Sequence, residues 1–517
     1  MRLGSVRGSG CVRSRGRESV SAERMLDERC VMVESWKCLT PLVGPVSSRS
    51  AHRELRKAHT PMIDPRVASG LRDLPPAVMI PRERMLAAFR RVFAGFGFVP
   101  IETPHIERME VLTGKGAGSD EVLRQIFEVT NKGGKPGELA LRFDLTVPLA
   151  RFVAKHIDEL GTPFKRYAIG SVFRGERPAK GRFREFVQCD FDTIGTTSAV
   201  ADAETAQVIH AALVAAGVPE FTITLNHRKI LDGFLASQGL GALSGQVLRA
   251  LDKLSKIGRE AVLGELERAI DVGGPGLTAD QARQVLAFVE TGRGGAEVLE
   301  SARATLGSNP AAAEGLAALQ TVLDLLDAAG VPRTRLAIDL GLARGLDYYT
   351  GIVLETTVQG WEKFGSVASG GRYDDLASLF TTRRLPGVGA SIGLDRLLAL
   401  MDEAGWLGSS AATAPVLVAQ FPGTDPAIPV RLAARLRAAG IGAEVFPDPI
   451  PIGKQMGYGS KKGHQVAVIV GPDEEAKQVF NLRNLATRAE DKGLAWSVLE
   501  DSVASALEIN KQQGAGS

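Results

Sequence analysis

A pair of strand-like runs separated by a basic loop is the feature that most limits what this chain can fold into. The runs KRYAIGSVF and FREFVQCDFDTI lie between residues 164 and 194 and are rich in aromatic and β-branched residues, and the polar segment RGERPAKGR separates them. Runs of this kind around a glycine-bearing segment are typical of two antiparallel strands with a long loop. The chain must therefore contain an antiparallel sheet that includes this hairpin.

Other strand and helix patterns surround the hairpin. The segment PRERMLAAFRRVFAGFGF places Pro81 at the first position of a predicted helix and spaces Met85, Phe89 and Phe93 on one helical face. The proline-interrupted stretch VPIETPHIE that follows predicts an edge strand. Further on, LAIDL and GIVLETTV predict strands, and GVGASIGL predicts a strand that leads into the helix DRLLALMDE. Helices that flank an antiparallel sheet define an α+β fold.

Two other regions differ from this pattern. Between about 229 and 330 the sequence is rich in Ala, Leu and Glu, and its leucines follow helical spacing, which predicts a helical insertion. The run GSSAATAP marks a linker that ends near Pro415. Beyond it, VLVAQF, VRLAARLRAAG, AEVFP and VAVIVG alternate strand and helix patterns. This alternation predicts a small α/β domain with a mostly parallel sheet.

A length of 517 residues predicts about three domains. Residues 1–61 show no sustained strand or helix period, which predicts a disordered N-terminal extension. A targeting peptide and a true start at Met62 both remain open for this extension. The predicted boundaries are 62–403 for the main domain with its insertion at about 229–330, 404–414 for the linker, 415–509 for the C-terminal domain and 510–517 for a polar tail.

Charge and cysteine content exclude several classes of protein. The formal net charge is +3, but residues 1–60 hold twelve basic and six acidic side chains, so the rest of the chain is slightly acidic. Any nucleic-acid surface must therefore be a local basic patch. Cys11, Cys30 and Cys38 lie in the extension, and Cys189 is the fourth cysteine, so no disulfide framework is expected and a reducing compartment, the cytoplasm, is predicted. The sequence has no CxxC, no HExxH and no apolar run of about 18 residues, so neither a protein-bound metal nor a membrane span is predicted.

Arginines in two segments suit a polyanionic ligand. Arg174, Glu176 and Arg182 lie in the loop of the hairpin, and Arg396 lies in the first turn of the helix that follows the glycine-rich strand. A planar guanidinium binds phosphate at two points, and a carboxylate can accept from the adenine amino group, so these residues suit ATP. The alternatives are a solvated charged turn for the loop and a surface arginine for Arg396.

These segments resemble the signature motifs of a known family. The hairpin, the stretch 81–112 with Pro104, and the strand and helix at 387–403 together resemble the three motifs of class II aminoacyl-tRNA synthetases. The peptides ARGLDYYTG and ASGGRYDDL, with the hairpin ending QCDFD, resemble sequences peculiar to histidyl-tRNA synthetases. The resemblance covers Met62 to Glu508, and no HIGH-like or KMSKS-like sequence indicates class I.

The resemblance implies both a fold and an activity. The fold would be a six- or seven-stranded antiparallel sheet flanked by helices, with a helical insertion, a C-terminal α/β anticodon-binding domain, and a homodimer formed through the first motif. The activity would be that of a ligase that uses ATP to convert L-histidine to histidyl-adenylate, releases pyrophosphate, and transfers histidine to the 3′ end of tRNA(His). Mg²⁺ would arrive bound to ATP, held mainly by phosphates and water.

Two relatives without this activity are the alternatives. A synthetase-like regulatory subunit of histidine biosynthesis would act as a binding module, and a tRNA-sensing pseudo-enzyme would bind tRNA without charging it. Both are expected to lose the arginines that serve ATP. This chain keeps Arg174, Arg344 and Arg396.

The choice of amino acid depends on how an imidazole can be bound. Its two ring nitrogens, one a donor and one an acceptor when neutral, call for a carboxylate on one side and a hydroxyl on the other, which Asp192 and Tyr349 supply. Asp192 could instead be a salt-bridge partner within the hairpin, and Tyr348 or Tyr349 could be a core aromatic. The resemblance implies histidine-binding roles for Asp144, Leu145, Thr146, Arg174, Gln188, Asp192, Arg344, Tyr348 and Tyr349, ATP-binding roles for Arg174, Glu176, Arg182 and Arg396, and catalytic roles for Arg174 and Arg344.

A lysine-rich segment of the C-terminal domain is the candidate for tRNA contacts. The peptide IGKQMGYGSKKGH places Lys454, Lys461 and Lys462 near Tyr458. Cations beside an aromatic ring suit an unstacked base and its phosphates. The alternative is a solvated lysine face. Resemblance to the class IIa anticodon-binding domain favours the tRNA interpretation.

Overall fold

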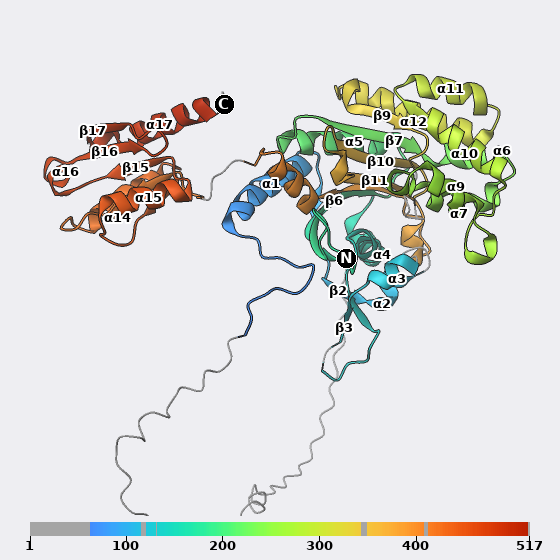
Figure 1. Cartoon of the computed structure of the whole chain (residues 1–517), viewed down its shortest axis with the longest axis horizontal. Helices are drawn as coiled ribbons and strands as arrows, with labels where there is room; N and C mark the ends of the chain where they lie inside the picture. Colours follow the sequence, from blue (N-terminus) through green and yellow to red (C-terminus); the bar gives the residue numbers. More distant parts are fainter. Residues whose placement is uncertain (1–62, 115–119, 131, 343–348, 408–411, 515–517) are drawn as a thin grey trace, which may run out of the picture. The chain divides into compact units, whose positions relative to one another are not determined.

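The computed structural model describes residues 63–114, 120–130, 132–342, 349–407 and 412–514 (Figure 1). The predicted N-terminal extension at 1–61 lies outside these residues. The chain divides into two units, Met1–Arg66 and Val67–Ser517, and the elements described below belong to the second unit. Within the described residues, no helix combines the length and the apolar character that crossing a membrane requires.

The first helix, α1 (Pro76–Gly95), begins earlier than the sequence indicated. The carbonyl oxygen of Pro75 accepts from the amides of Val78 and Met79, both at 2.9 Å, and Pro76 lies in the first turn. The prediction that Pro81 opens the helix is therefore wrong, because the preceding proline pair already provides a compatible start. The predicted apolar face is confirmed, since Met85, Phe89 and Phe93 are buried.

A nine-stranded sheet forms the centre of the main domain. Strands β5 and β6 pair antiparallel along their whole length, from Phe164 opposite Ile194 to Phe173 opposite Glu185, which confirms the predicted hairpin. Among the described strands of this sheet, β1 pairs parallel with β5 and β7 with β9, and the other pairs are antiparallel. The sheet is wider than the predicted six or seven strands, in part because two-residue strands form its edges. In spatial order the strands are β1 (Val99–Pro100), β5 (Phe164–Phe173), β6 (Glu185–Ile194), β12 (Gly387–Gly393), β11 (Ala368–Tyr373), β10 (Ile352–Val358), β7 (Phe221–His227), β9 (Leu336–Asp339) and β8 (Arg293–Gly294).

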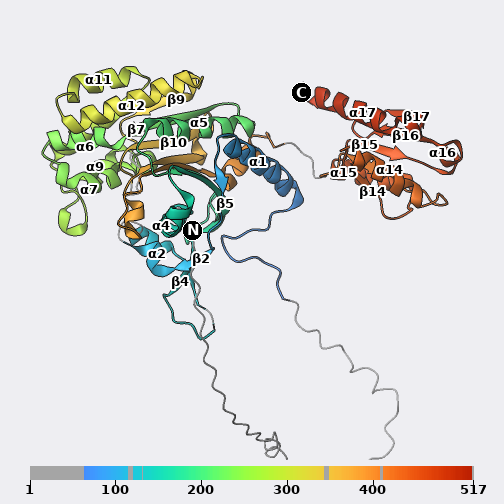
Figure 2. The ribbon, with the colours of Figure 1, turned by 180° about the vertical axis from the view of Figure 1, so that it is seen from behind.

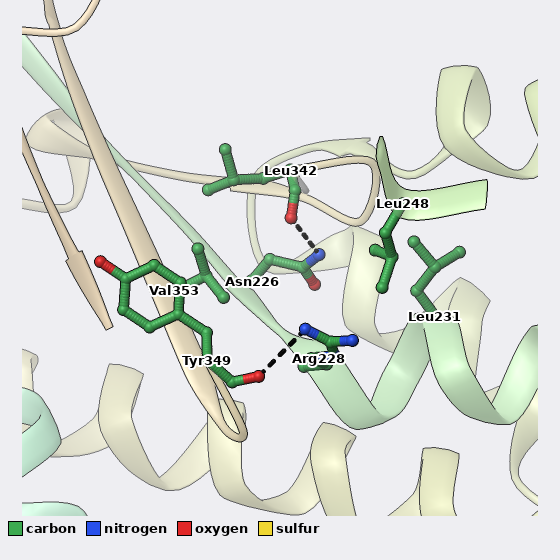
Figure 3. A pocket seen from close by; sticks show the side chains of 7 residues that line it. All are labelled: Asn226, Arg228, Leu231, Leu248, Leu342, Tyr349 and Val353. Atoms are coloured by element: carbon green, nitrogen blue, oxygen red, sulfur yellow. Dashed lines mark hydrogen bonds between the residues drawn. The ribbon is translucent and has the colours of Figure 1, made fainter. Parts of the chain in front are cut away.

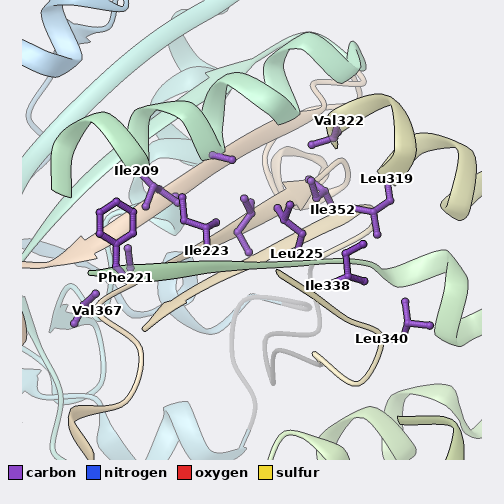
Figure 4. Packing of buried hydrophobic residues seen from close by; sticks show 14 of the residues in the cluster. Ile209, Phe221, Ile223, Leu225, Leu319, Val322, Ile338, Leu340, Ile352 and Val367 are labelled. Atoms are coloured by element: carbon purple, nitrogen blue, oxygen red, sulfur yellow. The ribbon is translucent and has the colours of Figure 1, made fainter. Parts of the chain in front are cut away.

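One face of this sheet packs against helices and forms the main core. Phe221, Ile223 and Leu225 of β7 contact apolar side chains of the covering helices, among them Ile209 and Leu319 (Figure 4). This large apolar cluster excludes water from that face and supplies most of the driving force for folding. The helices that contribute to it include α1, α5 (Ala199–Ala215), α12 (Pro310–Ala328) and α13 (Leu394–Glu403).

The opposite face of the sheet is covered by other elements. Helix α4 (Thr146–Leu160) packs there against Tyr349, Val353 and Tyr373 in a second, smaller apolar cluster. A three-stranded sheet and two short helices belong to the same part of the chain. They are β2 (Ile106–Arg108), β4 (Leu139–Leu141), β3 (Glu128–Val129), α2 (Met109–Thr113) and α3 (Asp120–Gln125).

The predicted helical insertion is a set of mostly short helices around α12, seen from behind in Figure 2. Four residues with helical spacing near its start differ in burial: Val247, Leu248 and Leu251 are buried and Leu254 is partly buried. The four leucines with helical spacing at 316, 319, 323 and 326 are all buried. The two-residue strand β8 interrupts the helices and pairs with β9. The remaining helices of this region are α6 (Arg228–Ser237), α7 (Ser244–Leu251), α8 (Leu254–Ile257), α9 (Arg259–Glu267), α10 (Ala279–Thr291) and α11 (Glu297–Leu306).

The C-terminal domain has a five-stranded sheet of order β14-β13-β15-β16-β17 and its own apolar core. The first three strands are parallel and the last two are antiparallel, so the sheet is mixed where the sequence predicted a mostly parallel one. The last helix continues to Gly514, beyond the predicted domain end at 509. In chain order the elements are β13 (Val416–Val418), α14 (Ala427–Ala438), β14 (Ala443–Val445), α15 (Ile452–Lys462), β15 (Val466–Ile469), α16 (Pro472–Lys477), β16 (Val479–Asn484), β17 (Glu490–Ala495) and α17 (Leu499–Gly514).

Candidate active site

Strand β6 carries apolar and polar side chains in alternation from Val187 to Asp192. Cys189 and Phe191 are fully buried in the main core, and Cys189 is a free thiol whose pKa is raised by burial, as expected for a small strand residue rather than a nucleophile. Successive side chains of a strand point to opposite faces, so Gln188, Asp190 and Asp192 lie on the other face. Two of these three are acidic and buried. The side of the nine-stranded sheet that carries Gln188, Asp190 and Asp192 is called the polar face below.

Glycines on the neighbouring strands leave room on the polar face. Gly389 of β12 lies directly opposite Asp192, and a Cβ added there would come within 2.1 Å of Asp192 Oδ1. On β11, a Cβ on Gly371 would come within 2.7 Å of the Tyr349 ring. Since both positions must lack a side chain, Asp192 and Tyr349 occupy the space directly above the sheet.

Asp192 is held by two partners. Arg166 faces it across the β5–β6 pair, with 2.5 Å between Arg166 Nη2 and Asp192 Oδ2, and both side chains are buried. The Tyr373 hydroxyl donates to Asp192 Oδ1. Burial raises the pKa of Asp192, while Arg166 and the Tyr373 hydrogen bond oppose that rise. The salt-bridge interpretation of Asp192 is therefore confirmed as a contact, and the same contacts orient the carboxyl while leaving acceptor capacity for a ring N–H.

Tyr349 is buried near Tyr373, which contacts Asp192. Its backbone carbonyl accepts from Arg228 Nη1 at 3.1 Å, and its ring points away from Arg228 (Figure 3). The ring packs with Val353 in the smaller apolar cluster, as a core aromatic would. The Tyr349 and Tyr373 side chains also interact electrostatically. Tyr349 is therefore both a core aromatic and a neighbour of Tyr373, whose hydroxyl contacts the Asp192 carboxyl.

Asp144 lies at the start of α4 and is tied to the same region. Its Oδ1 accepts from the amides of Thr146 at 3.1 Å and Val147 at 2.9 Å. Burial raises the pKa of Asp144, and the Val147 amide and Arg174 oppose that rise. The carbonyl of Leu145, whose side chain is buried, accepts from Arg166 Nη2 at 3.4 Å. The turn with Asp144, Leu145 and Thr146 and strand β6 therefore share Arg166 as a common anchor.

Arg174 follows β5 and lies between this turn and β6. Its Nε donates to the Phe143 carbonyl at 3.2 Å, and its guanidinium carbon lies 4.4 Å from the Phe143 ring centre and 5.1 Å from that of Phe186. Contacts of a guanidinium with aromatic faces restrain its position while leaving donors for an anion. Arg174 is therefore a half-buried cation next to Asp144.

The remaining residues predicted to bind ATP gather around the hairpin loop. Glu176 and Arg182 face each other at 4.0 Å, and Arg182 is exposed. A Cβ on Gly181 would lie 3.7 Å from Arg396 Cγ, so the loop reaches the start of α13. Arg396 Nη1 donates to the Ser366 carbonyl at 2.5 Å. The fold thus brings Glu176, Arg182 and Arg396 together, although they are far apart in the sequence.

Two of the predicted residues, Arg344 and Tyr348, lie outside the described residues. The residues before and after this segment are hydrogen-bonded to Asn226 and Arg228, at the start of the helical region (Figure 3). Asn226 Nδ2 donates to the carbonyls of Leu340 and Leu342, each at 3.1 Å, and Arg228 holds the carbonyl of Tyr349. The hollow between these residues has room for about one water molecule. Among the predicted site residues that the structure describes, Tyr349 alone lines it.

The sequence analysis missed four residues of the polar face, namely Arg166, Asp190, Tyr373 and Ser391. Period-two alternation with Gln188 and Asp192 could have identified Asp190. Tyr373 was in the peptide ASGGRYDDL without a role. Ser391 reaches β6 through the β6–β12 pair, which no local sequence signal shows. Arg166 lies on the predicted hairpin, but the register that places it opposite Asp192 does not follow from the pattern of either strand.

In the C-terminal domain, the predicted tRNA residues all lie on α15. Lys454, Lys461 and Lys462 are exposed, and Lys462 Nζ lies 5.5 Å from the Tyr458 ring centre. Tyr458 is half-buried, donates its hydroxyl proton to Glu444, and packs edge to face against Phe446. The lysines therefore form an exposed cationic face, whereas Tyr458 is anchored to its own domain.

Comparison with known proteins gives a consistent result. Residues 70–397 match the sequence model of the histidyl-tRNA synthetase family, and residues 427–505 match that of an anticodon-binding domain. A histidine–tRNA ligase of Rhodopirellula baltica is 49% identical over 436 residues, which are 84% of this chain and 96% of that protein. One of Wolinella succinogenes is 43% identical over 426 residues, with 82% and 94% covered.

A solved structure agrees with these matches. The crystal structure of histidyl-tRNA synthetase from Nostoc sp. PCC 7120 has a TM-score of 0.76 and 34% sequence identity to this chain, and the match covers 85% of this chain and 99% of that one. The α+β fold predicted from the sequence is therefore that of the relatives. Since these similarities extend over nearly the whole length of the relatives and include both domains, the chain belongs to the histidyl-tRNA synthetase family.

Proposed function

We propose that the polar face of the nine-stranded sheet is where this histidine–tRNA ligase activates its amino acid. A carboxylate oxygen of L-histidine attacks the α-phosphorus of ATP, and the bond to pyrophosphate breaks. The terminal ribose hydroxyl of tRNA(His) then attacks the carbonyl carbon of histidyl-adenylate, and AMP leaves. The observation that carries this placement is the buried carboxyl of Asp192, which Arg166 and Tyr373 hold beside Tyr349.

Histidine would be recognised at both of its polar ends. We assign the imidazole to Asp192 and Tyr349, with Tyr348 next to them in the chain. The α-ammonium group would bind Asp144 and Thr146, which the turn at Leu145 holds together, and Gln188 of β6. Because buried polar partners are left unsatisfied by an analogue that lacks the matching groups, such a pocket can reject analogues by a factor on the order of 10⁴ to 10⁵.

ATP would be bound by the cations around the hairpin. Arg174 would contact both the α-phosphate and the carboxylate of histidine, and Arg344 would supply a second cation at the α-phosphate. Glu176 would accept from the adenine amino group, and Arg182 and Arg396 would bind phosphate or stack on the base. Mg²⁺ would enter with ATP as part of the substrate. The position of Arg174 beside Asp144 supports its dual role.

Further proposals concern partners and compartment. The cationic face of α15 would bind the anticodon region of tRNA(His) through Lys454, Lys461 and Lys462, with Tyr458 nearby. We infer a homodimer formed through the first motif, which the exposed Val99 and Ile106 in that part of the chain support. We also infer a cytoplasmic enzyme, which the free thiol of Cys189 supports.

Amino-acid-dependent exchange between ATP and pyrophosphate tests the assignment. Purified protein should exchange label with histidine and not with the other nineteen amino acids. Asp192→Asn should raise the KM for histidine and leave the KM for ATP nearly unchanged. Absence of exchange by folded protein would contradict the activity and would agree with a regulatory or sensing relative instead.

A further inference from the structure

Three polar side chains form a connected row on the polar face. Gln188 Nε2 donates to Ser391 Oγ at 2.9 Å, and the Ser391 hydroxyl is hydrogen-bonded to the carboxyl of Asp190. Ser391 lies directly opposite Asp190 in the β6–β12 pair. Since a hydroxyl has a single proton, Ser391 donates it to Asp190 and accepts from the Gln188 amide. The row therefore fixes which end of the Gln188 amide points toward Ser391.

Two acceptors of this row lack a partner within the described residues. Gln188 Oε1 and Asp190 Oδ1 are both buried and make no hydrogen bond there. Asp190 is 1% exposed. A buried acceptor without a donor destabilises the folded protein, and such groups commonly mark a ligand position. The two atoms belong to residues two positions apart on β6, and Gln188 and Asp192, on either side of Asp190 on this face, are among the residues assigned to histidine.

Charged groups from several elements surround Asp190. Asp192 on β6 and Asp144 before α4 are two further carboxyls that act on it, and Arg166 of β5 is the cation that acts on it most strongly. Burial raises the pKa of Asp190 to about 7, with Arg166 opposing and Asp192 reinforcing the rise. The buried Arg142 acts on Asp190 as well, and Arg174 acts on Asp144, so the three carboxyls lie among three guanidiniums. The kind of ligand therefore follows from the two unpaired acceptors and not from a shortage of positive charge.

We propose that Asp190 is a further substrate-binding residue, which together with Gln188 Oε1 holds the α-ammonium group of histidine. An ammonium group has three donors and no acceptor, so it satisfies both unpaired acceptors, one of which is a carboxyl oxygen. Ser391 is then a positioning residue, because its hydrogen bonds present Gln188 Oε1 to the ligand. This inference rests on the proposed location of the histidine site.

Two analogues of histidine separate this role from a structural one. Histidinol keeps the imidazole and the ammonium group, whereas imidazolepropionate keeps the imidazole and lacks the ammonium group. Each is measured as an inhibitor of histidine-dependent exchange by the full-length protein at pH 8. Asp190→Asn should raise the inhibition constant of histidinol by about 10- to 100-fold, the range expected for a hydrogen bond to a charged group. The inhibition constant of imidazolepropionate and the KM for ATP should not change.

Asp192→Asn is the matched control, since its loss should weaken both analogues, which share the imidazole. Equal weakening of both analogues by Asp190→Asn, or no weakening of histidinol, would overturn the proposal. If Asp190→Asn does not fold, Ser391→Ala provides the same comparison, with a selective loss for histidinol supporting the proposal and an equal loss overturning it. Wild-type protein without histidine-dependent exchange would instead contradict the location of the site itself.

Discussion

Arg166 shows how much of the site depends on a single buried charge. Its side chain is completely buried, forms an ion pair with Asp192, and donates to the Leu145 carbonyl. Arg166 Nε and Nη1 have no hydrogen-bond partner within the described residues. Removing one member of a buried ion pair leaves the other charge uncompensated, which is more costly than losing the pair's attraction.

Arg166→Met should therefore destabilise the protein by about 3 to 5 kcal/mol. Arg182→Met is the matched control, because Arg182 is exposed and its loss should change stability by less than about 0.5 kcal/mol. The free energy of unfolding of each variant is measured by urea denaturation monitored by circular dichroism. Equal stability of the two variants would show that Arg166 does not hold the carboxyls of the polar face.

The buried carboxyl of Asp190 should make the free energy of unfolding depend on pH. Burial raises its pKa to about 7 in the folded protein, with Arg166 and Ser391 opposing the rise and Asp192 and Asp144 adding to it. In the unfolded chain an aspartate titrates near 3.9, so between these values the folded state binds one more proton. Stability from this group is therefore complete below about pH 4 and is lost as the pH rises toward 7.

Between pH 5 and pH 7, wild-type protein without substrates should lose about 2 kcal/mol of stability in total relative to Asp190→Asn, with a slope that falls by about half as the pH approaches 7. The comparison between the two proteins isolates Asp190 from other carboxyls whose pKa is also raised by burial, such as Asp202. Urea denaturation at several pH values measures both slopes. Parallel slopes would mean that Asp190 is already ionised in the folded protein across this range.

At the scale of elements, the site depends on how closely β12 approaches β6. A Cβ on Gly389 would lie 2.1 Å from Asp192 Oδ1 and 2.5 Å from the Phe191 carbonyl oxygen. The second contact is with backbone, so moving the Asp192 side chain alone cannot relieve the overlap. Gly389→Ala should therefore destabilise the protein by about 1 to 3 kcal/mol and raise the KM for histidine.

The control for this prediction is Gly264→Ala in α9. A Cβ on Gly264 meets nothing within 4 Å, and alanine is favoured over glycine within a helix by about 1 kcal/mol. Gly264→Ala should raise the melting temperature and leave the KM for histidine unchanged. Calorimetry and exchange kinetics on both variants check the pair, and a Gly389→Ala enzyme with normal KM would show that Asp192 does not need its observed position.

The sequence predicts elements well where the pattern is local and poorly where it depends on pairing. The hairpin of β5 and β6 follows from alternation within each strand, and α1 follows from the spacing of Phe89 and Phe93. The two-residue strands β1 and β8 have no pattern of their own and exist only because longer strands accept them. Likewise, the alternation of strand and helix patterns from VLVAQF to VAVIVG did not show that β16 and β17 would add antiparallel pairs to the C-terminal sheet.

The same distinction explains the candidate site. Gln188, Asp192 and Tyr349 could be predicted because each lies in a peptide that resembles a family signature. Arg166 and Ser391 could not, because their importance comes from facing β6 across a strand pair. The sequence likewise predicts the ring of Tyr458 beside the lysines but not the hydrogen bond that its hydroxyl donates to Glu444 of the same domain.

At the scale of the whole molecule, the two domains have separate hydrophobic cores. The main core is formed by residues from Met85 to Met401, and the cores of the C-terminal domain are formed by residues from Val416 to Val503. No buried residue belongs to both sets within the described part of the chain. A domain with its own core can fold alone, so the activities of the two domains should be separable.

Removing residues 412–517 should leave histidine-dependent exchange within about twofold of wild type and reduce tRNA charging by at least about tenfold, the factor that a loss of 1.4 kcal/mol of binding produces. The cut precedes Ala414 because the Ala414 carbonyl interacts with His464 at 2.8 Å, so Ala414 belongs with the C-terminal domain.

The full-length variant Lys461→Ala with Lys462→Ala is the control, since it keeps the domain and removes two cations of α15. It should weaken charging in a salt-dependent way and leave exchange unchanged, because phosphate contacts are sensitive to ionic strength. Charging that survives both changes would show that α15 does not bind the tRNA, whereas loss of exchange in the shortened protein alone would show that the main domain requires the C-terminal domain to be active.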